Sequence, residues 1–358
     1  MVEIWILGAT GRAGRSISAG LCTSGHQIVL VGRNAQRLSE AAAAIEALGG
    51  PTPRTLVTDD PAAQIAADRP DVVVNTVGPF GTTTVPTAQA CVAAGSHYVD
   101  LANEFEPVRS LLELDTVARA AGSTLVTGAG FGVLATEALV YELCAGRPAP
   151  ARVWVAAMPV VDGLGPAVLA SVVDAAATGG LVYRNGRLVR TRLGAHLQHT
   201  PLPDGTTRDT VAVPTGELEA ALRASGAGEV IATSSEVPTG RTARAALPIV
   251  GAVLRVDAVR RTVIRAVDRW QLTPPSTPGD ASWAYACAEW EGGETRQAWL
   301  RTGEGYQFTS RVAATVATRL AAGEARPGAF TPAALFGADL ARAAGGTITV
   351  DTAVKDLR

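Results

Sequence analysis

Lysine is almost absent from this sequence: Lys355 is the only one, and arginine supplies every other strongly basic side chain. A P-loop requires a lysine after its last glycine, a Schiff-base enzyme requires an embedded lysine, and short-chain dehydrogenases use Tyr-x-x-x-Lys. The residue four positions before Lys355 is Asp351 rather than a tyrosine. The sequence therefore excludes these three kinds of catalytic or nucleotide site.

Metal-binding side chains are also scarce, because the chain has only four cysteines and four histidines. The cysteines are far apart and form no C-x-x-C pair, at positions Cys22, Cys91, Cys144 and Cys287. His196 and His199 are three residues apart, in a polar segment without a nearby carboxylate on the same face. A zinc site needs at least three protein ligands. We therefore expect no metal ion, and reduced, buried thiols.

Excess positive charge and long apolar runs are missing as well. The formal net charge is −2 and the arginines are scattered among acids, which argues against nucleic acid as a partner. No uninterrupted apolar stretch reaches the roughly 18 residues that span a bilayer. No basic segment precedes the first apolar run, so a signal peptide is not expected. The sequence predicts a soluble, cytoplasmic protein that binds no membrane.

Length and composition point to a folded protein of two domains. The chain has 358 residues, of which 47% are hydrophobic and 18% are charged, a balance typical of folded enzymes. We expect a cofactor-binding domain at residues 1–132 and a substrate and dimerisation domain at residues 133–305. Residues 306–358 are expected to form helices and a strand that pack back on the first domain.

Short apolar strands alternate with helical segments over the first 132 residues. Strands are expected at 2–7, 27–31, 55–57, 71–76, 97–100 and 124–127. Helices are expected at 15–24, 35–48, 62–67, 85–94 and 107–121. Continuous apolar strands that alternate with helices predict an α/β domain of Rossmann type, with a parallel sheet covered on both faces. Such a sheet binds its ligand at the carboxyl ends of its strands.

The pattern changes after residue 150. Strands are expected at 152–159, with one face exposed, and at 229–233, 283–290 and 295–301, with a hairpin over 181–190. The hairpin turns at Asn185-Gly186, a pair that favours tight turns. Helices are expected at 167–178, 307–322 and 331–344. The second domain is therefore predicted to be α+β, built around a largely antiparallel sheet.

A glycine-rich loop, G-A-T-G-R-A-G, follows the first predicted strand and precedes a helix. Gly8 permits the tight bend, Gly11 lets the backbone approach a pyrophosphate, and Gly14 allows close packing of helix on strand. Backbone N–H groups and the helix dipole then face the anion. The alternative is an ordinary strand-to-helix turn.

The second strand ends in Gly32-Arg33, where an NAD-specific fold places an acid for the ribose hydroxyls. An arginine matches the charge and geometry of a 2′-phosphate, and Arg12 and Arg37 are expected to close on the same group. The sequence therefore favours NADP(H) over NAD(H). Solvated surface arginines are the alternative.

A rigid Gly-Pro turn follows the strand that ends near Asn75, and it is expected to carry the nicotinamide ribose and one face of the ring. A plain loop is the alternative. The residues expected to bind the cofactor are Gly8, Thr10, Gly11, Arg12, Ala13, Gly14, Arg33, Asn34, Arg37, Asn75, Val77, Gly78, Pro79 and Phe80.

These motifs together resemble the saccharopine dehydrogenase-like NADP-binding family, which includes saccharopine reductases and trans-acting enoyl reductases of actinobacteria. The resemblance rests on G-A-T-G-R-A-G-R, V-L-V-G-R, V-V-V-N-T-V-G-P-F-G, A-C-V-A-A-G-S-H-Y-V-D-L-A-N-E and A-R-P-G-A-F-T-P-A-A-L-F-G. It covers nearly the whole chain and is strongest over residues 1–135 and 305–340. It implies a Rossmann domain interrupted by a substrate domain, a homodimer, and reduction of a C=N or conjugated C=C bond. The C-terminal half, in which Lys355 is the only lysine, departs from saccharopine reductase.

Proton transfer needs an acid near the carboxyl end of a strand. The catalytic candidates are Tyr98, Asp100 and Glu104, joined by His97 and Tyr141, because a tyrosine or carboxylic acid there can protonate the product of hydride transfer. The alternative is that Asp100 and Glu104 brace the following helix.

Three functions remain open, and the first is NADPH-dependent reduction of an imine or enamine of a small metabolite. The second is reduction of an enoyl thioester carried by another protein, which requires a basic rim that this near-neutral sequence does not obviously supply. The third is a sensor that binds NADP(H) without turnover.

The glycines of the segment 128–132 are expected to form a hinge between the domains.

Overall fold

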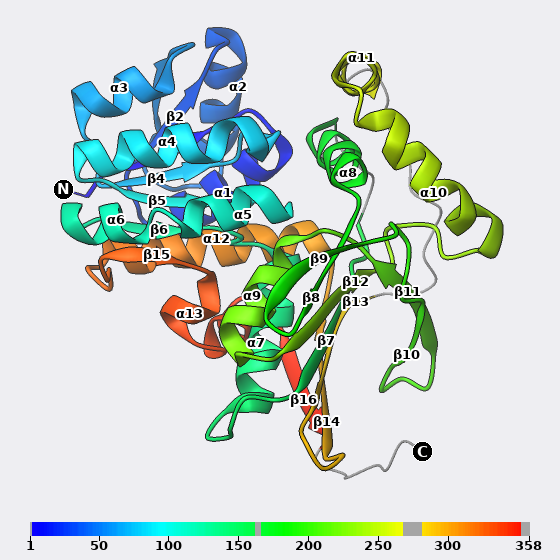
Figure 1. Ribbon diagram of the computed structural model, residues 1–358. Coiled ribbons are helices and arrows are strands. Elements are labelled where there is room, and N and C mark those ends of the chain that lie inside the picture. Colours follow the sequence, from blue (N-terminus) through cyan, green and yellow to red (C-terminus); the bar gives the residue numbers. More distant parts are fainter. Residues whose placement is uncertain (1, 162–165, 268–280, 352–358) are drawn as a thin grey trace. The chain divides into compact units, whose positions relative to one another are not determined.

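A computed structural model describes residues 2–161, 166–267 and 281–351 (Figure 1). Lys355 and the rest of 352–358 lie outside the described residues. The chain divides into two compact units. The first comprises residues 1–102, 106–130 and 306–335, and the second comprises residues 103–105, 131–305 and 336–358. The end of the predicted segment 306–358 therefore groups with the second unit.

In the described part of the chain, the first unit contains a seven-stranded parallel sheet with the strand order β15-β6-β5-β4-β1-β2-β3. Its strands are β1 (Ile4–Leu7), β2 (Ile28–Gly32), β3 (Arg54–Val57), β4 (Val72–Asn75), β5 (His97–Asp100), β6 (Thr124–Val126) and β15 (Gly328–Phe330). The predicted Rossmann-type sheet is confirmed, but β15 was not predicted, because three residues between glycine and threonine carry no periodic signal.

The sheet is apolar throughout its centre. All four residues of β1 are buried, and Ile4 pairs with Ile28 of β2 on one side and with Val72 of β4 on the other. The chain runs outward from β1 to β3 and then returns to β4 on the opposite side of β1. The strand order therefore reverses between β1 and β4, which is where sheets of this kind bind their ligands.

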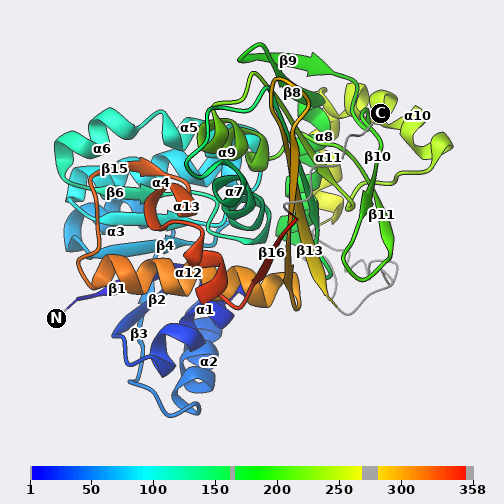
Figure 2. The same ribbon diagram turned by 90° about the horizontal axis from the view of Figure 1, so that it is seen from below.

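Helices cover both faces of this sheet. They are α1 (Arg12–Thr23), α2 (Ala35–Glu46), α3 (Pro61–Asp68), α4 (Phe80–Ala94), α5 (Phe105–Leu112), α6 (Asp115–Ala121), α12 (Gly305–Ala321) and α13 (Pro332–Phe336). Figure 2 shows α1, α2 and α12 on one face and α3, α4 and α6 on the other. The helix α12 contacts α1, because the side chain of Thr318 lies 3.1 Å from Nε2 of His26 at the end of α1.

Two predicted helices are each divided in the structure. The segment 107–121 forms α5 and α6, because Asp115 begins a new helix and accepts a hydrogen bond from the backbone N–H of Ala329 at 3.0 Å. The segment 331–344 is interrupted at Gly337, whose φ of 76° a helix cannot contain. Its second half is α14 (Asp339–Ala343).

The second unit holds a mixed sheet, nine-stranded over the residues described, with the path β10-β11-β12-β7-β13-β14-β16 and the hairpin β8-β9 paired to β12. Its strands are β7 (Arg152–Met158), β8 (Gly180–Arg184), β9 (Arg187–Thr191), β10 (Gln198–Pro201), β11 (Thr207–Ala212), β12 (Glu229–Ser234), β13 (Ser282–Glu289), β14 (Thr295–Thr302) and β16 (Thr347–Asp351). Neighbouring strands are antiparallel except β7 and β12. The predicted α+β character and the hairpin at Asn185-Gly186 are confirmed.

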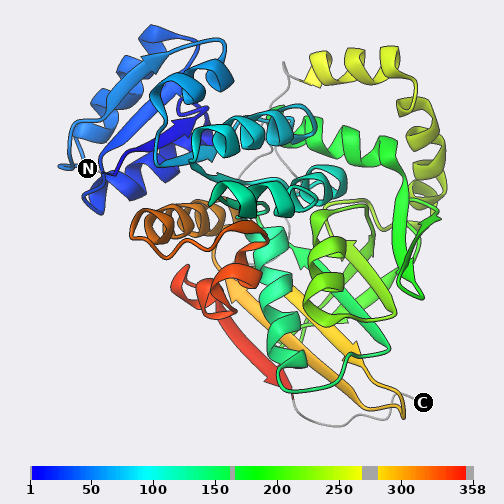
Figure 3. The same cartoon turned by 60° about the vertical axis from the view of Figure 1, so that its left-hand side comes forward.

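Small side chains on one face of this sheet let a buried helix approach. Ala284, Ala286 and Ala298 are fully buried, and α7 (Phe131–Cys144) packs on β13 and β14 with most of its own surface buried (Figure 3). The opposite face carries larger side chains, among them Trp283 and Trp299. The prediction that β7 has an exposed face is wrong, because β7 lies between β12 and β13 and its last four residues are buried.

The last described strand belongs to the second sheet. β16 pairs with β14. The register sets Ile348 opposite Leu300 and Val350 opposite Ala298, so that the two apolar residues of β16 follow the apolar face of β14. The remaining helices of the second unit are α8 (Pro166–Thr178), α9 (Gly216–Ser225), α10 (Arg241–Leu254) and α11 (Asp257–Val267). Within the described ranges, no helix is long and apolar enough to cross a membrane.

Candidate functional site

The glycine-rich loop connects β1 to α1 at the point where the strand order reverses. Gly8 has a φ of 74°, and its carbonyl accepts the N–H of Gly11 at 2.9 Å, which closes the turn. A Cβ on Gly14 would lie 2.8 Å from the Cα of Ala9 and would also collide with the carbonyl of Gly8. Only glycine at position 14 therefore allows the helix to start this close to the strand.

The start of α1 has the features of an anion-binding site. Gly11 is the N-cap residue and has no side chain to accept the first backbone N–H groups, and the first turn contains no acid. A Cβ on Gly11 would meet only the carbonyl of Gly8, at 3.3 Å, so that the other side of this residue is open. Free N–H groups at the positive end of a helix dipole form a phosphate site.

A second loop, between β4 and α4, packs against the first. The hydroxyl of Thr76 donates to the carbonyl of Leu7 at 2.7 Å, and the hydroxyl of Thr83 donates to the carbonyl of Val77 at 2.6 Å. Val77 is exposed, and Gly78, Pro79 and Phe80 are partly exposed at the start of α4. This edge of the sheet therefore presents the predicted turn to solvent beside the glycine-rich loop.

Asn75 takes a different position from the other predicted ligands. Its side chain is fully buried, its Oδ1 accepts the N–H of Val77 at 3.0 Å, and its Nδ2 donates to the hydroxyl of Tyr98 at 3.0 Å. These bonds fix the direction in which the loop leaves β4. Asn75 thus shapes the loop from behind.

The end of β2 carries two arginines that are available for a ligand. Arg33 and Arg37 are exposed, and neither forms an ion pair with another described residue. Between them, Asn34 is the N-cap of α2, and its Oδ1 accepts the N–H of Arg37 at 2.9 Å. Two unpaired guanidinium groups beside the site of a ribose suit a phosphate on that ribose.

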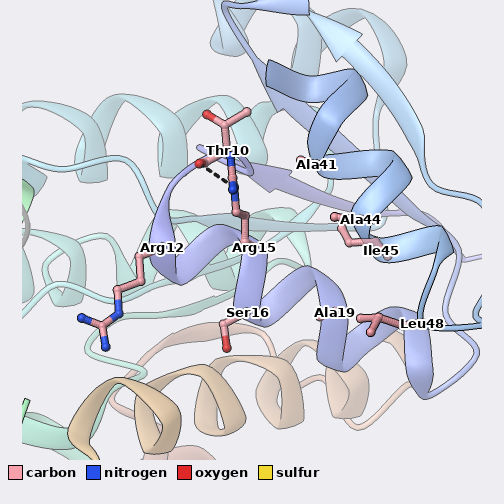
Figure 4. A pocket seen from close by; sticks show the side chains of 9 residues that line it. All are labelled: Thr10, Arg12, Arg15, Ser16, Ala19, Ala41, Ala44, Ile45 and Leu48. Carbon is pink, nitrogen blue, oxygen red and sulfur yellow. Dashed lines mark hydrogen bonds between the residues drawn. The ribbon is translucent and has the colours of Figure 1, made fainter. Parts of the chain in front are cut away.

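Arg12 and Arg15 leave the first turn of α1 in different directions (Figure 4). The guanidinium of Arg12 lies 4.1 Å from the ring centre of Tyr306, a cation–π contact in the first unit, and its expected contact with the phosphate beside Arg33 stays a prediction. Arg15, which was not predicted, donates from Nε to the carbonyl of Thr10 at 3.0 Å. The motif G-R-A-G-R contains both arginines, and only the three-dimensional path of the helix separates their directions.

A hollow of about 620 Å³ opens between α1 and α2 (Figure 4). Thr10, Arg12 and Arg15 line its end at the glycine-rich loop, and Ile45 and Leu48 line its other end. Ala13, the remaining predicted ligand, is half-buried in the first turn of α1. The basic end of the hollow therefore adjoins the expected phosphate site.

Two of the predicted catalytic residues are enclosed in the first unit. Tyr98 and Asp100 are fully buried, and the Tyr98 hydroxyl donates to Oδ2 of Asp100 at 3.0 Å. Asp100 also accepts the hydroxyls of Thr84 at 3.0 Å and Thr127 at 2.8 Å. Burial raises the pKa of both Tyr98 and Asp100. The hydrogen bonds that Asp100 accepts oppose the rise of its own pKa. Asp100 therefore joins β5 to α4 and to the segment after β6, and its catalytic role stays a prediction.

The other candidates lie elsewhere. His97 begins β5, at the end of the strand opposite the glycine-rich loop, and its Nδ1 accepts the N–H of Thr124 at 3.0 Å. Tyr141 and Glu104 belong to the second unit. Glu104 is buried, its carboxylate accepts the N–H of Asn103 at 3.0 Å, and its backbone forms a β-bridge with Thr215.

A buried acid that was not predicted lies beside Glu104 in the second unit. Glu217 is 3% exposed, and its Oε2 has no hydrogen-bond partner among the described residues. Burial raises its pKa to about 7, against hydrogen bonds from the side chains of Thr215 and Asn103. A Cβ on Gly132 would lie 2.5 Å from Oε1 of Glu217. The sequence around it, P-T-G-E-L-E, has the form of an ordinary helix start and gives no signal of this burial.

The two neighbouring histidines have a carboxylate partner that the sequence did not reveal. Nδ1 of His199 lies 2.5 Å from Asp209, because β10 and β11 pair these two residues directly. His196 instead packs against the ring of Trp154. No group of three or more histidine, cysteine or acidic side chains among the described residues is arranged to hold a metal ion.

The glycine-rich loop and the sheet around it match a known family. Residues 4–126 match the model of the saccharopine dehydrogenase NADP binding domain. The matched segment contains β1 to β6, both loops and the arginines at the end of β2. The cofactor class that we inferred from Arg33 agrees with this match.

Curated relatives resemble part of the chain. A trans-acting enoyl reductase of Mycobacterium leprae is 31% identical over 150 residues, which are 39% of this chain and 35% of the relative. A putative trans-acting enoyl reductase of Mycobacterium tuberculosis is 34% identical over 149 residues, with the same coverage. The similarity thus spans about a third of the length of these relatives.

A solved structure resembles the fold over a longer range. Apo saccharopine dehydrogenase (L-Glu forming) from Saccharomyces cerevisiae has a TM-score of 0.59 and covers 98% of this chain and 100% of its own, at 12% sequence identity. Such low identity supports the architecture alone. Taken together, these findings show that residues 4–126 are similar to the NADP binding domain of saccharopine dehydrogenases and that the chain shares their architecture.

Proposed function

We propose that this protein is an NADPH-dependent reductase that transfers hydride to an electron-poor double bond of a bound substrate. The observation that carries the proposal is the uncapped start of α1, which lies where the strand order reverses and has two unpaired arginines at the end of the neighbouring strand. Each part matches one phosphate group of the dinucleotide.

The chain's own residues would bind and orient the cofactor. The first N–H groups of α1 hold the pyrophosphate, and Arg33 and Arg37 hold the 2′-phosphate. The exposed loop from Val77 to Phe80 supports the nicotinamide half. NADPH, when bound, supplies the hydride.

Hydride addition leaves an anion that must gain a proton, and we propose Glu217 as its source in place of Tyr98 and Asp100. The hydroxyl of Tyr98 is enclosed by protein groups, whereas Oε2 of Glu217 has no hydrogen-bond partner in the part of the chain that the structure describes. With a pKa of about 7, this carboxyl is partly protonated near neutral pH and can both donate and recover a proton. A buried oxygen without a partner is unfavourable unless a ligand or water completes it.

The relatives' names favour an α,β-unsaturated thioester as the substrate over an imine, which stays our second candidate. In the enoyl reaction, hydride adds to the β-carbon, the C=C π electrons move to the α-carbon, and the acid donates its proton there. In the imine reaction, hydride adds to carbon and the proton goes to nitrogen. Both reactions consume one NADPH and one proton.

Oxidation of NADPH in the presence of a substrate panel tests this function. The panel contains crotonyl-pantetheine, longer 2-enoyl thioesters and cyclic imines. We expect turnover with a 2-enoyl thioester. Turnover with imines alone would select the second candidate, and tight NADPH binding without turnover of any compound would support a sensor instead. The homodimer that we expect is measured separately, by sedimentation of the purified chain.

A further inference from the structure

The helix α10 exposes an apolar face. Ile249 is 68% exposed and Val253 is 50% exposed, and their spacing of four residues sets them on one side of the helix. Val256, which is 53% exposed, follows the end of α10. Val250 is 46% exposed beside them. No charged residue occurs between Arg244 and Arg255. A continuous exposed apolar face of this kind marks an interaction site.

The inner side of α10 packs on its own unit, so the exposed side is not an unfilled part of the core. Leu254 is buried, and a Cβ on Gly251 would lie 2.8 Å from the carbonyl of Ala176 in α8. The guanidinium of Arg244 donates to the carbonyl of Gly194 at 2.9 Å. The helix is therefore fixed in place with its apolar face outward.

Positive charge surrounds this face. Residues 241–267, which span α10 and α11, contain six arginines and one aspartate, a local net charge of +5 in a chain whose formal charge is −2. Figure 1 shows α10 and α11 as consecutive helices. Arg241, Arg261 and Arg265 are exposed and form no ion pair with a described residue. Positive charge is therefore concentrated on α10 and α11, although the net charge of the whole chain is slightly negative.

The charge and the side-chain sizes of α10 and α11 indicate which kind of partner binds there. A second copy of this chain would bring one arginine-rich surface against another, which like charges oppose. A bilayer favours large inserting side chains such as Trp, Phe and Leu, whereas this face offers Ala, Val and Ile. Small side chains such as Ala245 and Ala252 let another helix approach closely. An acidic helical protein satisfies both conditions.

We propose that residues 241–267 form a docking surface for an acidic, helical carrier protein that delivers the substrate as a thioester. This inference rests on the proposed function, because a reductase of enoyl thioesters has a use for such a carrier. The arginines steer the carrier and pair with its acids, and the apolar face of α10 packs against one of its helices.

The test compares crotonyl-pantetheine with the same acyl group on a purified acidic acyl carrier protein. The docking variants are Arg261→Glu/Arg265→Glu and Ile249→Asp, all at exposed positions. The matched controls are Arg187→Glu and Val117→Asp, which are exposed on other elements. Fluorescence anisotropy of the labelled carrier measures binding independently of turnover.

We expect the docking variants to lower kcat/KM for the carrier-bound substrate by about tenfold or more while leaving the small thioester and the controls unchanged. Carrier binding should weaken in the same variants and with added salt. If no substrate is reduced but the wild-type chain binds the carrier through these residues, the proposed function fails and the docking surface stands. Wild-type-like carrier binding by both variants overturns the docking surface. The docking surface is also overturned if these variants keep carrier binding but lose self-association, or keep carrier binding but lose binding to anionic vesicles.

Discussion

The buried amide of Asn75 donates to the hydroxyl of Tyr98 at 3.0 Å, and that hydroxyl donates in turn to Asp100 at 3.0 Å. These two hydrogen bonds join the ends of β4 and β5 beneath the loop that is expected to carry the nicotinamide. We therefore predict that Tyr98→Phe acts on stability. It should lower the free energy of unfolding by about 1–2 kcal/mol, because one buried hydrogen bond on each side is lost.

Urea unfolding measures that loss, and the pH profile of kcat separates bracing from catalysis. The profile of the Tyr98→Phe variant should keep its wild-type shape. A fall in kcat of several hundredfold with unchanged stability would return Tyr98 to the catalytic role that we first expected.

Alanine at two positions of the glycine-rich loop should have different effects. Gly14→Ala should destabilise the first unit by about 1–3 kcal/mol, because its Cβ would collide with the backbone of Gly8 and Ala9. Gly11→Ala should change stability less, because its Cβ would meet only the carbonyl of Gly8, at 3.3 Å, but it should weaken NADPH binding, because the added methyl group lies at the expected phosphate site. Thermal unfolding and NADPH titration of both variants distinguish the two effects, and equal loss of stability would contradict this assignment.

Glu217 should make the protein less stable as pH rises. Its pKa rises from about 4.5 in the unfolded chain to about 7 in the folded one, so the folded state holds the proton more tightly between these values. The stabilisation is complete below pH 4.5 and is lost as pH rises through 7, by about 3 kcal/mol. Glu217→Gln removes this dependence. Urea unfolding at pH 5 and pH 8 should show a smaller difference in the variant, and an identical difference would contradict the shifted pKa.

The same substitution tests the proton donor. Glu217→Gln should lower kcat by about a hundredfold, in the range typical of lost general acid catalysis. The wild-type rate should fall above pH 7 as this carboxyl ionises, and the variant should lose that limb of the profile. An unchanged rate and profile would exclude Glu217 as the acid. Glu219→Gln, two residues further along α9, serves as the control.

The first unit could be predicted largely from the sequence because its signals are local. Continuous apolar strands, a glycine-rich loop and helix stop signals each act over fewer than about 15 residues. The positive φ at Gly8 and the close packing at Gly14 both require glycine, so the residue type is visible in the sequence. The arginine at the end of β2 is likewise visible as a departure from the acid expected there.

The second unit could be predicted only in part, because its partners are distant in the sequence. β16 pairs with β14 about 50 residues earlier, and no local pattern selects this edge. The strands β10 and β11 and the helices α7 and α9 to α11 were not predicted. The burial of Glu217 comes from Asn103 and Gly132, which reach it from separate segments.

The surroundings of the candidate acids were not predicted for a related reason. Sequence position correctly set Asp100 at the carboxyl end of β5 but could not show that Thr84 and Thr127 enclose it. Net charge misled in the same way about the second unit, because six arginines within residues 241–267 are offset by acids elsewhere.

Dinucleotide titration tests the central claim most directly. Calorimetric titration of the purified chain with NADPH and with NADH, repeated for Arg33→Ala/Arg37→Ala and for Arg187→Ala as the control, measures both binding and preference. We predict saturable binding of NADPH, weaker binding of NADH, and a loss of about tenfold to a hundredfold in NADPH affinity in the double variant alone. No saturable binding of NADPH by the wild-type chain, or an unchanged preference in the double variant, would contradict the account.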